Sequence, residues 1–172
     1  MKTKRRITAA SEAELTNAMK VHGLSVWKLA MSLTQSKEES EEIYQETFFR
    51  LWSHRKTYQD ESHLHNWLLK VAGNLSRSHL RSARHRRTAP LPETIETASP
   101  RNDFEEFLES ERFHSALSSL NDNERIAMHL LVIEEMTTKE IAHLLGCPHS
   151  TIRTRIRRAR STIAALYQED ER

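Results

Sequence analysis

The chain has few of the residues that interrupt helices. Only 3 of its 172 residues are glycine and 4 are proline, whereas the two together make up about 12 % of an average protein. Pro90, Pro92 and Pro100 fall in one short stretch, where a linker would lie. The scarcity elsewhere predicts long helices joined by few turns.

Cysteine and long apolar runs are also lacking. The single cysteine, Cys147, excludes an internal disulfide and a Cys-rich zinc site. No apolar run approaches the roughly 18 residues that would span a bilayer. The basic start of the chain is not followed by the apolar segment of a secretory signal. We therefore expect a cytoplasmic protein that does not insert into a membrane.

Charge is nearly balanced overall but segregated along the chain. Lysine and arginine number 26 against 24 acidic residues. Residues 70–87 carry six basic side chains and residues 153–160 carry five arginines, with no acid in either stretch, while residues 88–111 carry seven acids and one arginine. One such run would be an ordinary solvated helix face. Two acid-free arginine clusters favour binding to a polyanion such as nucleic acid.

Apolar spacing predicts helices through most of the chain. Positions from 15 to 33 recur with the helical period, and Gly23 is the weakest point of that helix. A capping box at Ser36 and Glu39 predicts a second helix over 37–54, and a third begins near Leu64. Residues 88–103 have no period and form a linker. Asn121 and Glu124 cap a further helix in a small second domain.

The second predicted helix has two apolar stripes. Ile43, Thr47 and Leu51 suit a domain core. A neighbouring stripe holds Gln45, Phe48, Phe49 and Trp52. Such a stripe is more often core than interface, but a small helical domain can hardly bury both sides of one helix. A partner protein on the second stripe is therefore plausible.

The third predicted helix turns a basic, amide-bearing face to solvent. Aromatic residues stand near its start, and aromatic rings supply stacking surfaces for unpaired bases while positive charge holds a phosphate backbone. Core packing is the equally good alternative for Trp67. The basic and amide face consists of Lys70, Asn74, Arg77, Ser78 and Arg81.

A helix-turn-helix is the strongest motif. Thr137 and Glu140 form a capping box, Gly146 closes that helix, and a second helix begins near Ser150. Such a pair places the second helix in the major groove. After the inward positions from Ile152 to Leu166 are removed, six residues face DNA: Ser150, Thr151, Arg153, Thr154, Arg157 and Arg158. An ordinary helical hairpin is the less favoured alternative.

Catalysis, metal binding and a bound cofactor are not expected. Cys147, His143 and His149 lie close in sequence but lack a fourth ligand, so they make a poor zinc site. The chain also has no glycine-rich phosphate loop, nucleophile elbow or metalloprotease motif. We therefore predict no catalytic residues, no metal and no cofactor.

Three segments resemble the extracytoplasmic-function sigma factors of bacterial RNA polymerase, in the sigma-70 family. They are residues 41–52, the run Trp67-Leu-Leu-Lys-Val-Ala-Gly-Asn-Leu75, and residues 137–160. The resemblance implies an all-α chain of two small helical domains joined by a flexible acidic linker. Region 2 would cover 12–87, the linker 88–109, and region 4, which contains the helix-turn-helix, 110–168.

The resemblance also implies roles. Core RNA polymerase would dock on Gln45, Glu46, Phe48, Phe49 and Trp52. The helix from Ser150 would read the minus-thirty-five element of promoter DNA, and an anti-sigma factor would be a further partner. The unpaired minus-ten strand would be held by Tyr58, His63, Trp67, Lys70, Asn74, Arg77 and Arg81.

Two departures and three rival interpretations stay open. Ser78 and Ser150 stand where many members have Asp and Gly, which points to an unusual promoter preference. An autonomous helix-turn-helix regulator would need a dimer interface for paired half-sites, and no heptad supplies one. A sigma-like decoy for an anti-sigma factor could dispense with its arginines. An enzyme acting on nucleic acid would need clustered carboxylates or a metal site.

Overall fold

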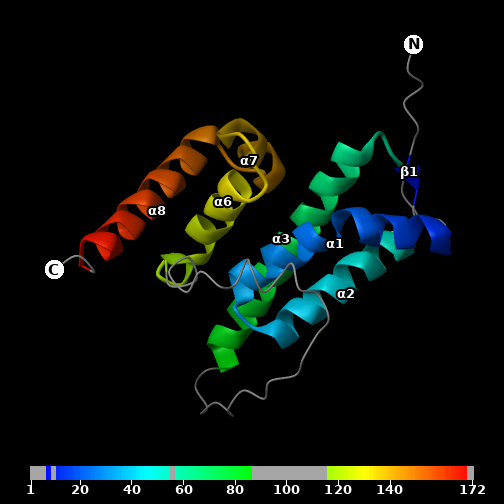
Figure 1. Ribbon diagram of the computed structural model, residues 1–172, viewed down its shortest axis with the longest axis horizontal. Coiled ribbons are helices and arrows are strands. Elements are labelled where there is room, and N and C mark those ends of the chain that lie inside the picture. Colours follow the sequence, from blue (N-terminus) through cyan, green and yellow to red (C-terminus); the bar gives the residue numbers. More distant parts are fainter. Residues whose placement is uncertain (1–6, 9–10, 55–56, 87–115, 170–172) are drawn as a thin grey trace.

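The computed structural model is almost entirely helical, as the sequence predicts. It describes residues 7–8, 11–54, 57–86 and 116–169. Among these described residues, a first body is formed by three helices and a second body by three more (Figure 1). The helices are α1 (Glu12–Thr34), α2 (Lys37–His54), α3 (Glu61–Arg86), α6 (Asp122–Val132), α7 (Thr138–Leu145) and α8 (His149–Glu169).

The first body is a bundle in which α1 packs against both α2 and α3. Leu29, Leu33, Ile43, Leu51 and Leu68 are fully buried between the helices. α1 continues through Gly23, where a Cβ would lie only 2.8 Å from the Tyr44 hydroxyl. Its lack of a side chain therefore lets the Tyr44 side chain of α2 lie close to the backbone of α1.

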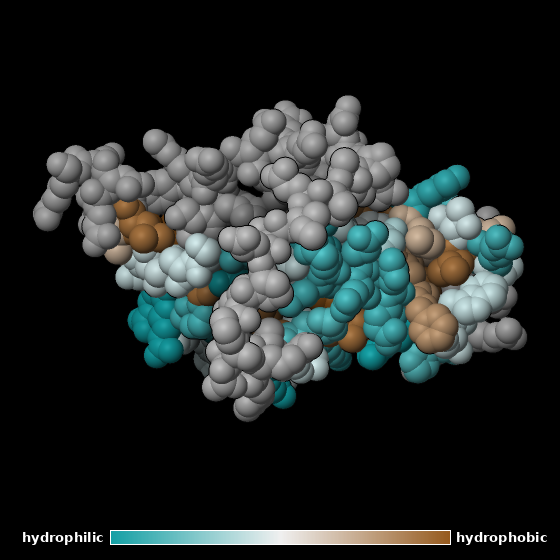
Figure 2. Space-filling model, turned by 90° about the horizontal axis from the view of Figure 1, so that it is seen from below, coloured by the Kyte–Doolittle hydropathy of each residue, from teal (hydrophilic) through white to brown (hydrophobic). Residues whose placement is uncertain are grey.

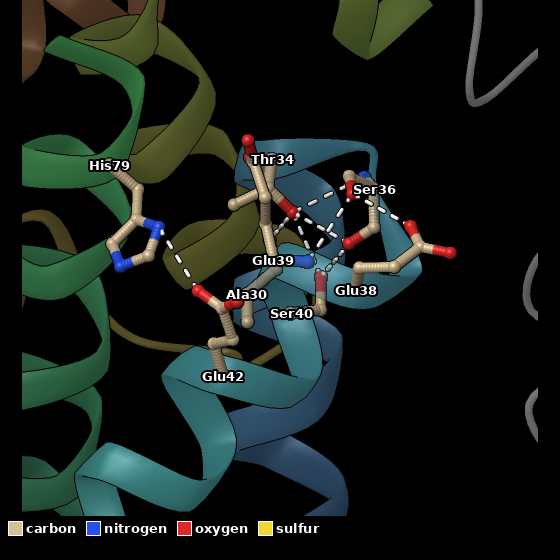
Figure 3. A network of polar contacts seen from close by, with 8 residues as sticks. All are labelled: Ala30, Thr34, Ser36, Glu38, Glu39, Ser40, Glu42 and His79. Atoms are coloured by element: carbon tan, nitrogen blue, oxygen red, sulfur yellow. Dashed lines mark hydrogen bonds and ion pairs between the residues drawn. The ribbon is translucent and has the colours of Figure 1, made fainter. Parts of the chain in front are cut away.

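The turn between α1 and α2 differs in one detail from the predicted capping box. The Ser36 hydroxyl accepts a hydrogen bond from the Glu39 N–H at 3.3 Å. The Ser36 N–H donates to Thr34 Oγ1 rather than to the Glu39 carboxylate (Figure 3). Gln35 ends α1 in the left-handed region, with φ 56°. Because α1 ends in this conformation, the Thr34 hydroxyl lies where it can accept the Ser36 N–H in place of the Glu39 carboxylate.

Two features at the entrance to the bundle were not predicted. Ser11 and Glu14 form a complete capping box at the start of α1. Two-residue strands, β1 (Ile7–Thr8) and β2 (Thr57–Tyr58), pair antiparallel. The third helix also begins at Glu61 rather than near Leu64, because Asp60 Oδ1 accepts the His63 N–H at 2.9 Å.

The second body contains the predicted helix-turn-helix. Asn121 with Glu124 and Thr137 with Glu140 form the two expected capping boxes. Gly146 closes α7 with φ 63°. Ile152, Ile156 and Ala159 are buried along α8, so that helix presents the inward face that its spacing predicts. Phe104, Phe107 and Phe113, which precede this body in the sequence, lie outside the described residues.

Replacing Gly146 with alanine is expected to destabilise the helix-turn-helix by about 1 kcal/mol, because a Cβ is unfavourable at positive φ. No atom lies within 4 Å of the added Cβ, so backbone strain accounts for the whole effect. Urea unfolding measures the loss. A Gly146→Asn variant should recover part of it, and equal losses for Ala and Asn would contradict this origin.

The two bodies pack against each other, which the sequence did not predict. Ile126 and Leu130 of α6 belong to the same hydrophobic cluster as Leu29 of α1 and Leu69 of α3. A Cβ on Gly73 would lie 2.8 Å from Ile126 Cδ1, so the absence of a side chain in α3 lets α6 approach. The Arg125 guanidinium crosses the interface and donates to the Leu33 carbonyl at 2.9 Å.

Candidate nucleic-acid and partner interfaces

The proposed partner stripe of α2 is divided between surface and core. Phe49 is 63 % exposed, Gln45 is exposed and Trp52 is half-buried, and the three follow one another at i, i+4 and i+7. Phe48 is only 3 % exposed and packs on Tyr44, with the ring centroids 4.8 Å apart. The structure therefore places Phe48 in the core and leaves the other members available to a partner.

An ion pair on α2 borders this stripe. Arg50 Nε donates to Glu46 Oε1 at 2.7 Å, one turn away on the same helix. In Figure 2, apolar side chains gather at the end of the molecule where Figure 1 places the C-terminal half of α2. Exposed aromatic surface next to a polar border is typical of protein interfaces.

The basic face of α3 is built as the spacing predicts. Lys70, Asn74 and Arg81 are exposed, and Arg77 is half-buried. Arg77 Nη2 donates to Asn74 Oδ1 at 2.6 Å and its Nε donates to the Gly73 carbonyl at 3.3 Å. The two bonds hold the guanidinium beside the amide, which leaves a cation and amide donors on one helix face.

The aromatic residues near this face have different positions. Tyr58 is 2 % exposed and its hydroxyl has no hydrogen-bond partner among the described residues. Burial raises the pKa of Tyr58 to about 12. The ring packs between Trp67 and the exposed His63, with centroid distances of 5.6 and 5.7 Å. In this arrangement Tyr58 supports the surface from beneath, while His63 and part of Trp67 reach it.

The outer face of α8 carries the predicted groups. Ser150, Arg153, Arg157 and Arg158 are exposed, and Thr151 and Thr154 are half-buried. Thr154 Oγ1 donates to the Ser150 carbonyl at 3.0 Å. The N-terminal part of α8 therefore presents hydroxyls and arginines on the side opposite the buried isoleucines, as a recognition helix requires.

The basic surfaces of the two bodies approach each other where α3 meets α7. Arg155, which is half-buried, donates to Cys147 Sγ at 3.9 Å. Burial and the nearby positive charges of Arg155 and Arg81 lower the pKa of Arg77. Arg77 of α3 and Arg155 of α8 therefore lie close enough for their like charges to interact.

No metal-binding group and no membrane-spanning helix occur in the part of the chain that the structure describes. No three histidine, cysteine, aspartate or glutamate side chains there are arranged to hold a metal ion. None of the described helices is both long and apolar enough to cross a bilayer.

The described helices, with exposed arginines on the second helix of a helix-turn-helix, have the features of a DNA-binding protein. The models of Sigma-70 region 2 and Sigma-70 region 4 match residues 19–86 and 110–163. The chain is a member of the extracytoplasmic-function (ECF) sigma factors of the sigma-70 family. It therefore directs RNA polymerase to promoters and is not itself an enzyme.

Several relatives are similar over most of their length. The chain is 30 % identical over 146 residues to the ECF RNA polymerase sigma factor EcfG of Rhodopseudomonas palustris, covering 85 % of this chain and 81 % of that protein. It is 28 % identical over 149 residues to SigM of Bacillus subtilis, covering 83 % and 88 %.

Two solved structures have the same fold. One is the sigma factor RpoE from Bartonella quintana in complex with the anti-sigma factor NepR, at a TM-score of 0.71 and 21 % identity, covering 90 % of this chain and 97 % of that one. The other is CnrH in complex with the cytosolic domain of CnrY, at a TM-score of 0.69 and 24 % identity, covering 94 % of each chain.

Proposed function

We propose that this sigma factor binds core RNA polymerase and the two promoter elements through three separate surfaces. Core RNA polymerase docks on the exposed part of the α2 stripe, Gln45, Phe49 and Trp52, with Glu46 beside it. The unpaired minus-ten strand binds the α3 face with Lys70, Asn74, Arg77 and Arg81. The outer face of α8 reads the minus-thirty-five element. Region 2 is assigned to 12–87, the linker to 88–109 and region 4 to 110–168.

The assignment of the α2 stripe to polymerase binding depends on the exposure of Phe49. A phenylalanine that is 63 % exposed gains nothing from the core, and removing it from water at an interface contributes roughly 1.5–3 kcal/mol. Phe48 lies next to it in sequence yet is buried, so it is assigned a structural role. Tyr58 is likewise assigned to the support of the minus-ten surface and not to direct contact.

The adjacent phenylalanines provide the test. We expect Phe49→Ala to weaken binding to core RNA polymerase by about tenfold or more and to leave the unfolding midpoint unchanged, because the lost surface faces outward. Phe48→Ala is expected to cost about 3–5 kcal/mol of stability through the cavity that it opens. Affinity for core polymerase, urea unfolding and run-off transcription on fragmented genomic DNA are measured together.

Each outcome of that test has a clear meaning. New transcripts that depend on Phe49 support the docking surface. Unchanged polymerase binding by Phe49→Ala overturns the assignment. Sequence-specific binding to duplex DNA by the protein alone, with neither core binding nor transcripts, would favour an autonomous regulator. The exposed arginines of α8 favour a promoter-binding factor over a decoy.

Two further assignments follow from the family. We propose that the protein acts in the cytoplasm, where core polymerase and promoter DNA are found. We also propose that an anti-sigma factor holds it inactive. In the solved structures, RpoE is bound to the anti-sigma factor NepR and CnrH is bound to the cytosolic domain of CnrY. Co-purification of the untagged protein with a second chain would support this partner.

A further inference from the structure

A row of hydrogen-bonded polar side chains crosses the interface between the two bodies. His22 Nε2 lies 3.1 Å from Glu61 Oε1. His22 Nδ1 lies 3.2 Å from His65 Nδ1. His65 Nε2 lies 3.0 Å from Glu134 Oε2. The first three residues belong to α1 and α3, and only Glu134 comes from the second body, just after α6.

The number of hydrogens that these four side chains need determines the charge of the two histidine rings. Each carboxylate can only accept, so both Nε2 atoms must carry a hydrogen. The two Nδ1 atoms face each other, so one donates and the other accepts, and one further hydrogen lies between them. Three hydrogens on two imidazoles make one neutral histidine and one imidazolium.

The surroundings distinguish the two rings and keep Glu134 ionised. Burial, followed by the nearby His65, lowers the pKa of His22, so His22 is the neutral ring. Burial acts to raise the pKa of Glu134, but the nearby His129 and the hydrogen bond with His65 outweigh it and lower this pKa to about 2. Glu61 has a side chain that is 47 % exposed. The hydrogen count therefore assigns the additional hydrogen to His65, the ring that lies between His22 and Glu134.

The other polar groups at this place do not supply a second proton. His129 of α6 is fully buried, and burial lowers its pKa, so it is neutral. Its Nδ1 lies 2.8 Å from Ser32 Oγ of α1, and its Nε2 is 3.8 Å from Glu134 Oε1, too far for a hydrogen bond. Lys28 of α1 is the nearby cation, and its charge further disfavours an imidazolium at His129.

Separation of the bodies removes the need for the extra proton. Without Glu134, the His65 Nε2 faces water and can accept a hydrogen bond as a neutral ring. The remaining bonds of His22 to Glu61 and to His65 need only two hydrogens. Docking of region 4 on region 2 thus takes up about one proton whenever the freed His65 is neutral.

We propose that His65 and Glu134 form a proton-dependent latch that holds the two bodies together. The sign follows from the proton count: a state that binds more protons is favoured by acid. Acid favours the docked arrangement, and alkaline conditions favour separation. For one linked proton, the ratio of docked to separated molecules falls with rising pH by up to about tenfold per pH unit. Since docking brings Arg155 close to Arg77, the latch changes the electrostatic surroundings of the basic face of α3.

The direct test is nitrogen NMR of the histidine rings in the full chain. At pH 7.5 we expect His65 to show two protonated ring nitrogens and His22 to show one. In Glu134→Gln, the amide can donate to a neutral His65, so the imidazolium signal should disappear at that pH. Glu135→Gln changes the exposed neighbouring acid and should leave both rings as in the parent protein. Two neutral rings in the parent protein at pH 7.5 would overturn the proposal.

The conformational consequence is measured separately by small-angle X-ray scattering between pH 6 and 9. The parent protein and Glu135→Gln should expand as the pH rises, whereas Glu134→Gln should keep nearly the same radius of gyration throughout. An equal pH response in all three proteins, or expansion towards acid, would contradict the latch. Neither measurement uses polymerase or DNA, so failure of the latch and failure of the proposed surfaces are distinguishable.

Discussion

Replacing both Arg153 and Arg157 with alanine is expected to lower the affinity of the holoenzyme for its promoter by about a hundredfold or more. Each arginine that reads a base contributes about 1–3 kcal/mol, and 1.4 kcal/mol is a factor of ten. Both side chains are exposed on the outer face of α8, so the fold should not change. Promoter binding by the reconstituted holoenzyme is measured by filter retention and by run-off transcription.

The salt dependence of that binding separates two kinds of contact. If the pair contacts phosphates, the slope of log affinity against log salt should fall by about two, and all promoters should weaken alike. If it reads bases, the slope should change little and discrimination at the minus-thirty-five element should relax. Arg160→Ala on the same helix is the matched control. Unchanged affinity in the double variant would refute the assignment of α8.

Arg125→Ala is expected to cost about 3–5 kcal/mol of unfolding free energy. The buried guanidinium donates to four carbonyls, and each buried carbonyl left without a donor costs roughly 1–3 kcal/mol, part of which water recovers. The acceptors are the carbonyls of Leu117 at 2.8 Å, Leu33 at 2.9 Å, Leu120 at 2.9 Å and Ser118 at 3.2 Å.

Urea unfolding of the full chain measures this loss. Arg158→Ala, which removes an exposed arginine, should change stability by less than about 0.5 kcal/mol. Arg125→Lys should recover only part of the difference, because one ammonium has three donors and a shorter reach. A loss below about 1 kcal/mol in Arg125→Ala would show that the four bonds are dispensable.

Local chemistry could be predicted from the sequence where it depends on neighbouring residues. The boxes at Asn121 and Thr137 and the left-handed end at Gly146 each need only a few consecutive residues, and the structure has all three. Phe48 and Phe49 show the limit of such reasoning. They are adjacent in the same stripe, and only the packing of α2 in the bundle decides that Phe48 is buried and Phe49 is exposed.

The contacts between the bodies could not be predicted in the same way. Ser32 and His129 are 97 residues apart, and Leu33 and Arg125 are 92 apart, so no periodicity links them. His22 and His65 are 43 residues apart, so no local pattern links them either. Pairing of β1 with β2 was equally hidden, because two residues are too few to show alternation.

The hydrophobic cluster shared by the bodies has a thermodynamic consequence. Ile126 and Leu130 lie in one cluster with Leu29 and Ala72, so melting either body would expose apolar surface of the other to water. The regions are then coupled in their stability as well as in their geometry. Below the pH at which they separate, the chain should unfold as one cooperative unit, and a partner that parts them would divide that unit into two weaker ones.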